Sequence, residues 1–380
     1  MIISIATGPW LPVPAIQGGA VNRRWQGLAE EFAARGHEVR MICRSYPGQP
    51  STETINGVQY IRSGGFPQST NIAIDLLKDF IYAASVFAKL PPADILVIND
   101  FWLPVFASLR PSSGKIVVNA ARVPKGQYRL YAKAASFIAV SHPIQQAIIR
   151  QHPAVAARTR VIHNPIDTKI FCPPAQPRSN QGEKTILYVG RLHPEKGVHL
   201  LIDAFALLSK QFPKVKLRIV GPIQENQGGG GEKYLDRLKA KAQGLAIEFL
   251  PPVFDPSKLA RIYQDADLFC YPSLADKGEA FGVAPLEAMA CGLVPVISNL
   301  DCFKDFITDG TTGYFFEHRN SDPCKQLADV LLKAILTWET TIKTAKDAAQ
   351  QAKKFSYGAV AKQYLSEFES LLAEQKGVLV

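Results

Sequence analysis

Short apolar segments alternate with helical patterns along most of this chain, and the series runs twice. In the first half, the segments expected to form strands are residues 2–6, 38–43, 94–98, 115–119, 137–140 and 160–163. In the second half, they are residues 185–189, 216–220, 247–250, 268–271, 294–297 and 313–316. Strands that alternate with helices form parallel sheets with helices on both faces. The sequence therefore predicts an α/β fold with two Rossmann-like, doubly wound domains facing a central cleft, where ligands bind beyond the carboxyl ends of strands.

The two series of strands meet near residues 163–167, and a Pro-rich stretch over residues 172–177 follows. A chain of 380 residues with 47% apolar content is long enough to bury two separate cores. We therefore expect an N-terminal domain over residues 1–164 and a C-terminal domain over residues 165–360.

The basic charge of the chain is concentrated in its first half. The formal net charge is +10; residues 1–166 hold 17 Lys and Arg against 8 Asp and Glu, whereas residues 167–380 hold 26 against 25. This asymmetry favours an anionic partner, such as an acidic lipid or a lipid-linked phosphate, although a merely soluble basic surface is an alternative. The chain has no helix-turn-helix, RNP or zinc-finger pattern, so nucleic acid is not an expected partner.

The cysteines and the N-terminal residues indicate a cytoplasmic protein. The six cysteines have no paired spacing, which argues for a reducing compartment and against disulfides or a zinc site. The segment before Arg23 carries no basic leader and is interrupted by Gly and Pro. No stretch approaches the roughly 20 apolar residues of a membrane-spanning helix.

Residues 72–90 form an unusually apolar helical stretch. Its only charged residues are Asp75, Lys78, Asp79 and Lys89. Two interpretations remain open: a packed helix at the edge of the domain, and an amphipathic segment in peripheral contact with an anionic membrane at its inner, cytoplasmic face.

Glu279 and Glu287 stand eight residues apart where a loop is expected to run into a short helix. Pro285 suits the first helical position and Gly292 suits the exit, so Glu287 is expected in the first turn, beside free backbone N–H groups. Two carboxylates can accept hydrogen bonds from vicinal hydroxyls while the N–H groups hold a phosphate, and a nucleotide-sugar presents both groups. The alternative is a Glu that offsets the helix dipole and an unrelated loop acid.

Two cations and a pair of glycines give further anion-binding candidates. Arg191 and Lys196 fall between a strand end and a helix start, where a pyrophosphate would neutralise both; solvated loop charges are the alternative. Gly18 and Gly19 precede the first helix and allow close backbone approach to a phosphate, but the full Gly-x-Gly-x-x-Gly fingerprint is absent, and a plain tight turn fits equally.

A metal site is not expected. Asp265 and Asp267 form an Asp-x-Asp, but they fall at a helix-to-strand junction where acids are commonly solvated turn residues. The seven histidines show no ligand spacing, so the sequence predicts neither a metal nor another cofactor.

Taken together, these motifs resemble family 4 of the retaining glycosyltransferases (glycosyl transferases group 1), which have the GT-B fold. The motifs that occur in family order are Gly18-Gly19, Val189-Gly190-Arg191 with Lys196-Gly197, Val220-Gly221-Pro222, Tyr271-Pro272-Ser273, the two glutamates, and Asp309-Gly-x-x-Gly313. The match is specific over residues 165–360 and loose before them.

The resemblance implies that the C-terminal domain binds a nucleotide-sugar donor and the N-terminal domain an acceptor. Arg191 and Lys196 would bind the diphosphate, Glu279 the sugar hydroxyls and Glu287 the ribose. The remaining candidate donor-binding residues are Gly18, Gly19, Gly190, Gly221, Val253, Phe281, Gly282, Val283 and Ala284. Family members need no metal ion, and their last helix, here residues 361–380, rejoins the first domain.

The chain departs from the family in two places. Family members commonly carry a His after a central strand of the first domain, and here Asn119 takes that place, which makes it a catalytic candidate beside Glu279, Arg191 and Lys196. The frequent Gly-Gly-x-x-Glu turn is altered to residues 301–305. The residues expected to contact the acceptor are Arg23, Arg24, Asp100 and Arg122.

The expected function is retaining transfer of a sugar from a nucleoside diphosphate, with UDP as the expected nucleotide, to a glycan or lipid-linked acceptor in polysaccharide or glycolipid biosynthesis. Three alternatives remain: a GT-B nucleotide-sugar epimerase, a phosphorylase, and a non-catalytic sugar-nucleotide-binding partner of another transferase. A nicotinamide oxidoreductase is disfavoured because the dinucleotide fingerprint is missing.

Overall fold

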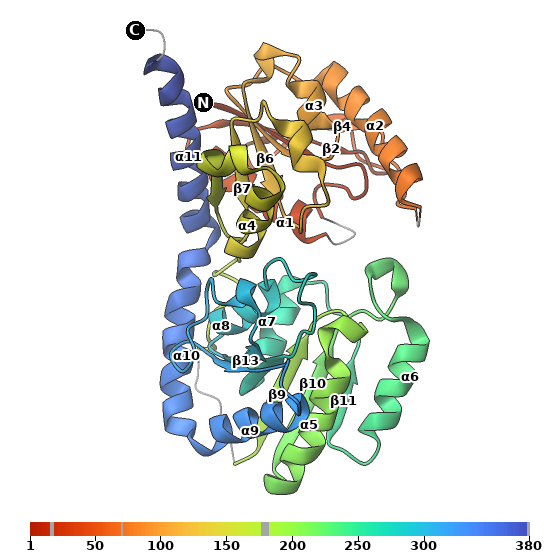
Figure 1. Cartoon of the computed structure of the whole chain (residues 1–380), viewed down its shortest axis with the longest axis vertical. Helices are drawn as coiled ribbons and strands as arrows, with labels where there is room; N and C mark the ends of the chain where they lie inside the picture. The colour runs from red at the N-terminus through yellow and green to blue at the C-terminus, as the bar shows by residue number, and fades with distance from the viewer. Residues whose placement is uncertain (16–18, 70, 176–181, 378–380) are drawn as a thin grey trace. The chain divides into compact units, whose positions relative to one another are not determined.

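A computed structural model describes residues 1–15, 19–69, 71–175 and 182–377 (Figure 1). The chain divides into two compact units. Unit 1 comprises Met1–Pro165 and Tyr357–Val380, and unit 2 comprises Ile166–Ser356. Each unit is an α/β domain with its own sheet.

The sheet of unit 1 has the strand order β3-β4-β2-β1-β5-β6-β7-β8 over the described residues. The strands are β1 Ile2–Thr7, β2 Glu38–Arg44, β3 Thr52–Ile55, β4 Val58–Ser63, β5 Ile95–Asn99, β6 Lys115–Ala120, β7 Ser136–Ala139 and β8 Thr159–Val161. All neighbours are parallel except β3 and β4, which form a hairpin. The six strands expected here are confirmed, with ends that shift by one or two residues.

The sequence interpretation missed the β3–β4 hairpin. Its turn is Asn56-Gly57, where both residues have positive φ, 51° and 79°. Asn-Gly is the strongest short-range signal for a two-residue hairpin turn, because both residues tolerate the left-handed region that such a turn requires. The signal was present in the sequence and was not used.

The helices of unit 1 include one from the far end of the chain. They are α1 Ala20–Ala34, α2 Ile72–Lys89, α3 Leu103–Ala107, α4 His142–Gln151 and α11 Tyr357–Gly377. Helix α11 packs on α1: the rings of Trp25 and Tyr364 lie 5.2 Å apart, and those of Phe32 and Phe368 lie 5.9 Å apart. The last helix therefore completes the core of unit 1, and it begins four residues earlier than the expected residue 361.

The sheet of unit 2 is parallel throughout its described strands, in the order β11-β10-β9-β12-β13-β14 (Figure 1). The strands are β9 Lys184–Val189, β10 Val215–Val220, β11 Ile247–Leu250, β12 Leu268–Tyr271, β13 Val294–Ser298 and β14 Tyr314–Phe316. The helices are α5 Val198–Gln211, α6 Gly231–Ala242, α7 Pro256–Gln264, α8 Val283–Ala290, α9 Pro323–Leu336 and α10 Trp338–Ala352. All six expected strands are confirmed to within one residue.

Each sheet reverses its winding once, and this reversal locates the candidate sites. In unit 1, β1 lies between β2 and β5; in unit 2, β9 lies between β10 and β12. The connections that leave two such neighbouring strands run in opposite directions, which opens a crevice at their carboxyl ends where ligands bind. The segments that follow β1 and β5, and those that follow β9 and β12, are therefore the places to look for function.

Candidate functional site

Lys196 and Glu279 form a buried ion pair at the switch point of unit 2. Lys196 follows β9, and its Nζ lies 2.7 Å from Oε2 of Glu279; the two side chains are only 6% and 10% exposed. The Ser273 hydroxyl, just after β12, donates to the same oxygen at 3.0 Å. The sequence placed Lys196 and Glu279 at one sheet edge, but it gave no role to Ser273, which holds the carboxylate in place.

Arg191 is held by the Gly-rich stretch of residues 228–231. Its Nη1 donates to the carbonyl oxygen of Gly228 at 2.7 Å, and its Nη2 pairs with Glu195 at 2.9 Å. The backbone N–H of Gly230 donates to the carbonyl oxygen of Leu192 at 2.8 Å, so this stretch is tied to the segment after β9. The guanidinium is thereby held by contacts on both of its terminal nitrogens.

Two glycines allow the loops of this edge to pack closely. At Gly221, where φ is 154°, a Cβ would collide with the carbonyl oxygen of Gly190. At Gly197, where φ is 68°, a Cβ would collide with the carbonyl oxygen of Pro272. The segments after β10, β9 and β12 thus touch through backbone, and Val253, half-buried in the loop after β11, belongs to the same edge.

Helix α8 presents an N-terminus that no described side chain caps. Gly282 is the N-cap residue, and Val283 and Ala284 open the first turn. The expectation that Pro285 is the first helical residue is wrong: Pro285 is the third, and Glu287 lies in the second turn. Proline fits anywhere in the first turn, because those N–H groups have no partner within the helix, so its presence did not fix the start. The helix ends at Ala290 with Cys291 as its C-cap, and Gly292 follows in the left-handed region with φ 75°, which fits the expected exit.

Glu287 is positioned by a tyrosine from another helix. The hydroxyl of Tyr263, on α7, donates to Oε2 of Glu287 at 3.1 Å and lies 3.3 Å from the carbonyl oxygen of Ala284. Burial, together with the charge of Glu287, raises the pKa of Tyr263 well above its usual value, so this hydroxyl remains a donor. No local sequence signal pointed to Tyr263, because it meets Glu287 only through the packing of α7 on α8.

A second contact fixes the loop that carries Glu279. Oδ1 of Asp276 accepts from His318 at 2.9 Å and from Arg319 at 2.7 Å, and these bonds, the one from His318 foremost, lower the pKa of Asp276. Both partners follow β14, and the sequence interpretation named neither. At the opposite, amino end of β12, Asp267, considered as half of a metal motif, accepts from the backbone N–H of Thr185 at 2.8 Å and so joins two strands.

Asn119, which stands where family members commonly carry a His, is buried in a hydrogen-bond network at the carboxyl edge of the unit 1 sheet. Its Nδ2 donates to Oδ1 of Asn99 at 2.7 Å, and the indole N–H of Trp25 donates to the same oxygen at 2.7 Å. Among the described residues, Oδ1 of Asn119 has no hydrogen-bond partner. The sequence interpretation missed Asn99, the last residue of β5, although a polar residue at the carboxyl end of a parallel strand indicates a possible site.

The acceptor candidates do not form one cluster. Arg24 is buried; its Nη1 donates to Asn164 at 2.5 Å, and burial lowers its pKa. Asp100 is also buried and accepts from the N–H of Leu103 at 2.8 Å. Arg23 and Arg122 are exposed. No hydrogen bond or ion pair among the described residues joins Arg24 to Asp100 or Arg122.

The first glycine pair is only partly described. Gly18 lies outside the described residues. Gly19 is the N-cap of α1 with φ 100°, and a Cβ there would lie 2.7 Å from the side chain of Leu11. The loop after β1 therefore depends on glycine at position 19.

Helix α2 exposes apolar side chains. Tyr82, Ala83 and Val86 are buried, but Ile72, Ile74, Leu77, Phe80 and Ile81 are exposed. One side of the helix therefore packs on unit 1 and the other is exposed, whereas contact with an anionic membrane stays a prediction. In the described part of the chain, no helix is long and apolar enough to span a membrane.

Comparisons with known proteins agree with this architecture. The chain matches the family Glycosyl transferases group 1 over residues 174–355 and Glycosyltransferase Family 4 over residues 18–170. It is 31% identical to a phosphatidyl-myo-inositol mannosyltransferase of Mycobacterium tuberculosis, over 93% of each chain. A sucrose-phosphate synthase structure from Thermosynechococcus elongatus superposes with TM-score 0.78 at 21% identity and covers 98% of this chain and 100% of that one.

A third similar protein is Anabaena HepE, solved with UDP-glucose, with TM-score 0.70 and 19% identity over 97% of this chain and 100% of that one. At these identities the solved structures establish the fold, and the mycobacterial relative establishes the family. The two parallel-sheet units are those of the GT-B fold, and the chain is a glycosyltransferase that belongs to the family-4, group-1 glycosyltransferases.

Proposed function

We propose that this glycosyltransferase transfers a sugar from a UDP-sugar to a hydroxyl of a glycan or lipid-linked acceptor, with retention of the anomeric configuration and without a metal ion, in polysaccharide or glycolipid biosynthesis. The observation that carries the proposal is the grouping in unit 2 of Arg191, Lys196, Glu279 and Glu287 around the switch-point edge and the N-terminus of α8. The HepE structure, solved with UDP-glucose, supports UDP as the nucleotide.

The diphosphate, the ribose and the sugar of a nucleotide-sugar each have a counterpart in this group. The guanidinium of Arg191 can bind two diphosphate oxygens, while Lys196 acts as a point charge and the N–H groups of residues 283–284 hold a further oxygen. The carboxylate of Glu287 accepts hydrogen bonds from the ribose hydroxyls. The diphosphate competes for Lys196, which leaves the Glu279 carboxylate to accept hydrogen bonds from the sugar.

The chemistry follows from the charges. As the bond between the anomeric carbon and the diphosphate oxygen breaks, negative charge develops on the diphosphate, and Arg191 and Lys196 stabilise it. Glu279, which lies between Lys196 and Ser273, is assigned to hydroxyl recognition rather than to nucleophilic attack. The acceptor hydroxyl therefore attacks from the face that the diphosphate leaves, and its proton passes to a diphosphate oxygen, so configuration is retained.

Unit 1 is assigned to the acceptor. Relatives of this chain are named for phosphatidyl-myo-inositol and D-inositol 3-phosphate, which supports an acceptor with ring hydroxyls and a phosphate or lipid anchor. Residues 101–166 hold nine Lys and Arg and no Asp or Glu, which supports contact with a lipid phosphate or the inner face of an anionic membrane. In this proposal the exposed side chains of Arg23 and Arg122 would meet such a phosphate, and Arg24 and Asp100 would act from buried positions.

The test is release of nucleoside diphosphate from a panel of UDP- and GDP-sugars, run in EDTA with wild type, Glu279→Ala and Glu248→Ala. Glu248 forms an exposed pair with Arg218 at 3.1 Å and serves as the matched control. We expect release from one UDP-sugar, abolished in Glu279→Ala and retained in Glu248→Ala, and a product whose anomeric proton coupling in NMR matches that of the donor. Loss of activity in EDTA, or an inverted product, would contradict the metal-independent or the retaining part.

A non-catalytic nucleotide-sugar-binding protein is the second candidate. Asn119 favours it, because family members commonly carry a His at this place, whereas here the position holds an amide that is tied to Asn99. Calorimetric binding of UDP together with no release from any donor, in the presence of a broad acceptor panel, would favour this candidate. A new nucleotide-sugar formed without an acceptor would instead indicate an epimerase, and a response to inorganic phosphate a phosphorylase.

A further inference from the structure

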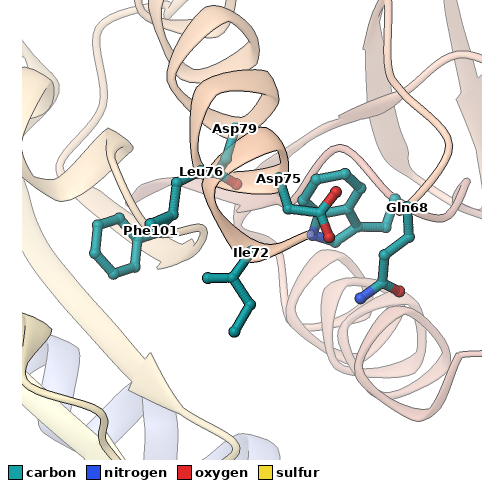
Figure 2. A pocket seen from close by; sticks show the side chains of 7 residues that line it. Gln68, Ile72, Asp75, Leu76, Asp79 and Phe101 are labelled. Carbon is teal, nitrogen blue, oxygen red and sulfur yellow. The ribbon is translucent and has the colours of Figure 1, made fainter. Parts of the chain in front are cut away.

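A pocket of about 200 Å³ opens in unit 1 beside the first two turns of α2 (Figure 2). Trp10 comes from the segment after β1, and Phe101 comes from the segment after β5. Since β1 and β5 are the strands between which the sheet reverses its winding, the pocket lies at the switch point of this unit, where ligands of doubly wound domains bind.

The size of the pocket limits what it can hold. Small-molecule sites commonly measure roughly 300–1,000 Å³, so this one suits a single ring rather than a nucleotide. Figure 2 shows Phe101 on one side of the start of α2 and the polar ends of Asp75 and Gln68 on the other, with Ile72 between them. A ligand in the pocket therefore meets an apolar wall and a polar one.

The polar wall consists of two carboxylates and one neutral amide. Asp75 and Asp79 line the pocket with the amide of Gln68, and none of its lining residues is a Lys or Arg. A carboxylate accepts hydrogen bonds from adjacent hydroxyls, whereas it repels a phosphate. The aromatic rings of Trp10 and Phe101 supply flat apolar surfaces for the C–H face of a ring.

The carboxylates are held in fixed positions. Oδ1 of Asp75 accepts from the backbone N–H of Ser69 at 2.8 Å, and Oδ2 of Asp79 accepts from that of Trp102 at 3.2 Å. Behind the pocket, Asp79 meets the buried Asp100. Burial raises the pKa of Asp79 to about 6, while burial and the charge of Asp79 raise that of Asp100 further. The side chains of Asp79 and Asp100 are hydrogen-bonded to each other.

We infer that this pocket is a subsite for one neutral polyhydroxylated ring, a pyranose or a cyclitol, whose adjacent hydroxyls donate to Asp75 and Asp79 while its C–H face packs on Trp10 and Phe101. That this ring belongs to the acceptor rests on the proposed function; the binding itself does not. The inference also assigns the acceptor's phosphate, where it has one, to a place outside this pocket.

The test is saturation-transfer NMR on the full chain with the methyl α-glycosides of glucose, mannose and galactose and with myo-inositol, beside glucose 6-phosphate as the charged probe. We expect at least one neutral ring to bind and the phosphate ester to bind about tenfold more weakly or not at all. Asp75→Asn and Trp10→Ala should each weaken binding about ten- to a hundredfold, because a charge-assisted hydrogen bond or a stacking face is lost. Asp347→Asn, an exposed helical acid in unit 2, is the matched control.

Two results would overturn the inference: no saturation transfer to any of the four neutral rings, or unchanged binding in both pocket variants. Circular dichroism checks that the variants are folded, and both positions are only half-buried. UDP binding, measured on the same samples, separates this inference from the proposed function. Ring binding without UDP binding would remove the donor assignment and leave the pocket, and UDP binding without ring binding would do the reverse.

Discussion

Replacing Lys196 by Met removes the cation from the buried pair with Glu279 while keeping most of its side-chain volume. The carboxylate stays about nine-tenths buried and retains the hydrogen bond from Ser273, but it loses a cation 2.7 Å away. Removing one partner of a buried ion pair costs about 3–5 kcal/mol, because an uncompensated charge remains in the interior. Since Ser273 still donates to this carboxylate, we expect the lower end, about 3 kcal/mol of unfolding free energy.

The double variant Lys196→Met/Glu279→Gln separates the charge effect from packing. The glutamine side chain introduced at position 279 would be neutral and would still accept from Ser273, so the double variant should recover at least about 2 kcal/mol of the loss. The matched control is Lys216→Met: Lys216 pairs with Glu183 at 2.9 Å, but both side chains are about half exposed, at 55% and 50%. An exposed pair of this kind contributes about 0–1 kcal/mol.

Urea unfolding followed by circular dichroism gives the free energies, and hydrogen exchange of residues 268–290 assigns the loss to unit 2. UDP should stabilise the wild type according to its occupancy and should stabilise Lys196→Met less, because the diphosphate has lost a cation. Transfer activity of Lys196→Met should fall about 10²–10³-fold. The reasoning is refuted if Lys196→Met costs no more than Lys216→Met, or if the cycle shows no coupling between residues 196 and 279.

Two further predictions concern backbone and pH. Gly197→Ala should lower the unfolding free energy by more than the about 1–2 kcal/mol that an alanine in the left-handed region costs, because its Cβ would also collide with a carbonyl oxygen. Gly244→Ala, with φ 78° and open space around the new Cβ, should cost only that amount. Equal losses of unfolding free energy in urea would refute the close approach at Gly197. Asp100→Asn should flatten the pH dependence of stability. Burial raises the pKa of Asp100 above its unfolded value of 3.8, so the folded state binds more protons than the unfolded state, and wild-type stability falls as the pH rises from 5 to 8. The amide introduced at position 100 would still donate to Asp79 but would not ionise. The prediction is contradicted if the melting temperature changes between pH 5 and pH 8 by the same amount in both proteins.

Much of the fold could be predicted because its signals are local. The strands of unit 2 were placed to within one residue, since short apolar runs between helical patterns are typical of the buried strands of a parallel sheet. Gly292 was recognised as a helix exit for the same reason, because the left-handed φ that it adopts is a property of one residue. The hairpin around Asn56-Gly57 was equally local, and missing it was an error of interpretation.

The start of α8 shows where such signals run out. Pro285 is compatible with every position of a first turn, so the helix could begin at Val283 without contradicting the sequence. Where the helix begins is settled by what surrounds it: a Cβ at Gly282 would collide with the ring of Phe303, so glycine and a close approach fix the N-cap. The proposed binding of the ribose by Glu287 does not depend on where the helix begins, but the position of Glu287 in the second turn does.

The sequence by itself determined the alternation of strands and helices, the glycines at tight backbone positions and the group of cations and acids at one sheet edge. Only the tertiary structure decided which of these groups meet: Lys196 with Glu279, Glu287 with Tyr263, and Asp79 with Asp100. The physical reason is that secondary structure follows from interactions between near neighbours in the chain. A buried pair depends on how whole helices and strands pack, and that packing sets both the distance between two side chains and their loss of solvent.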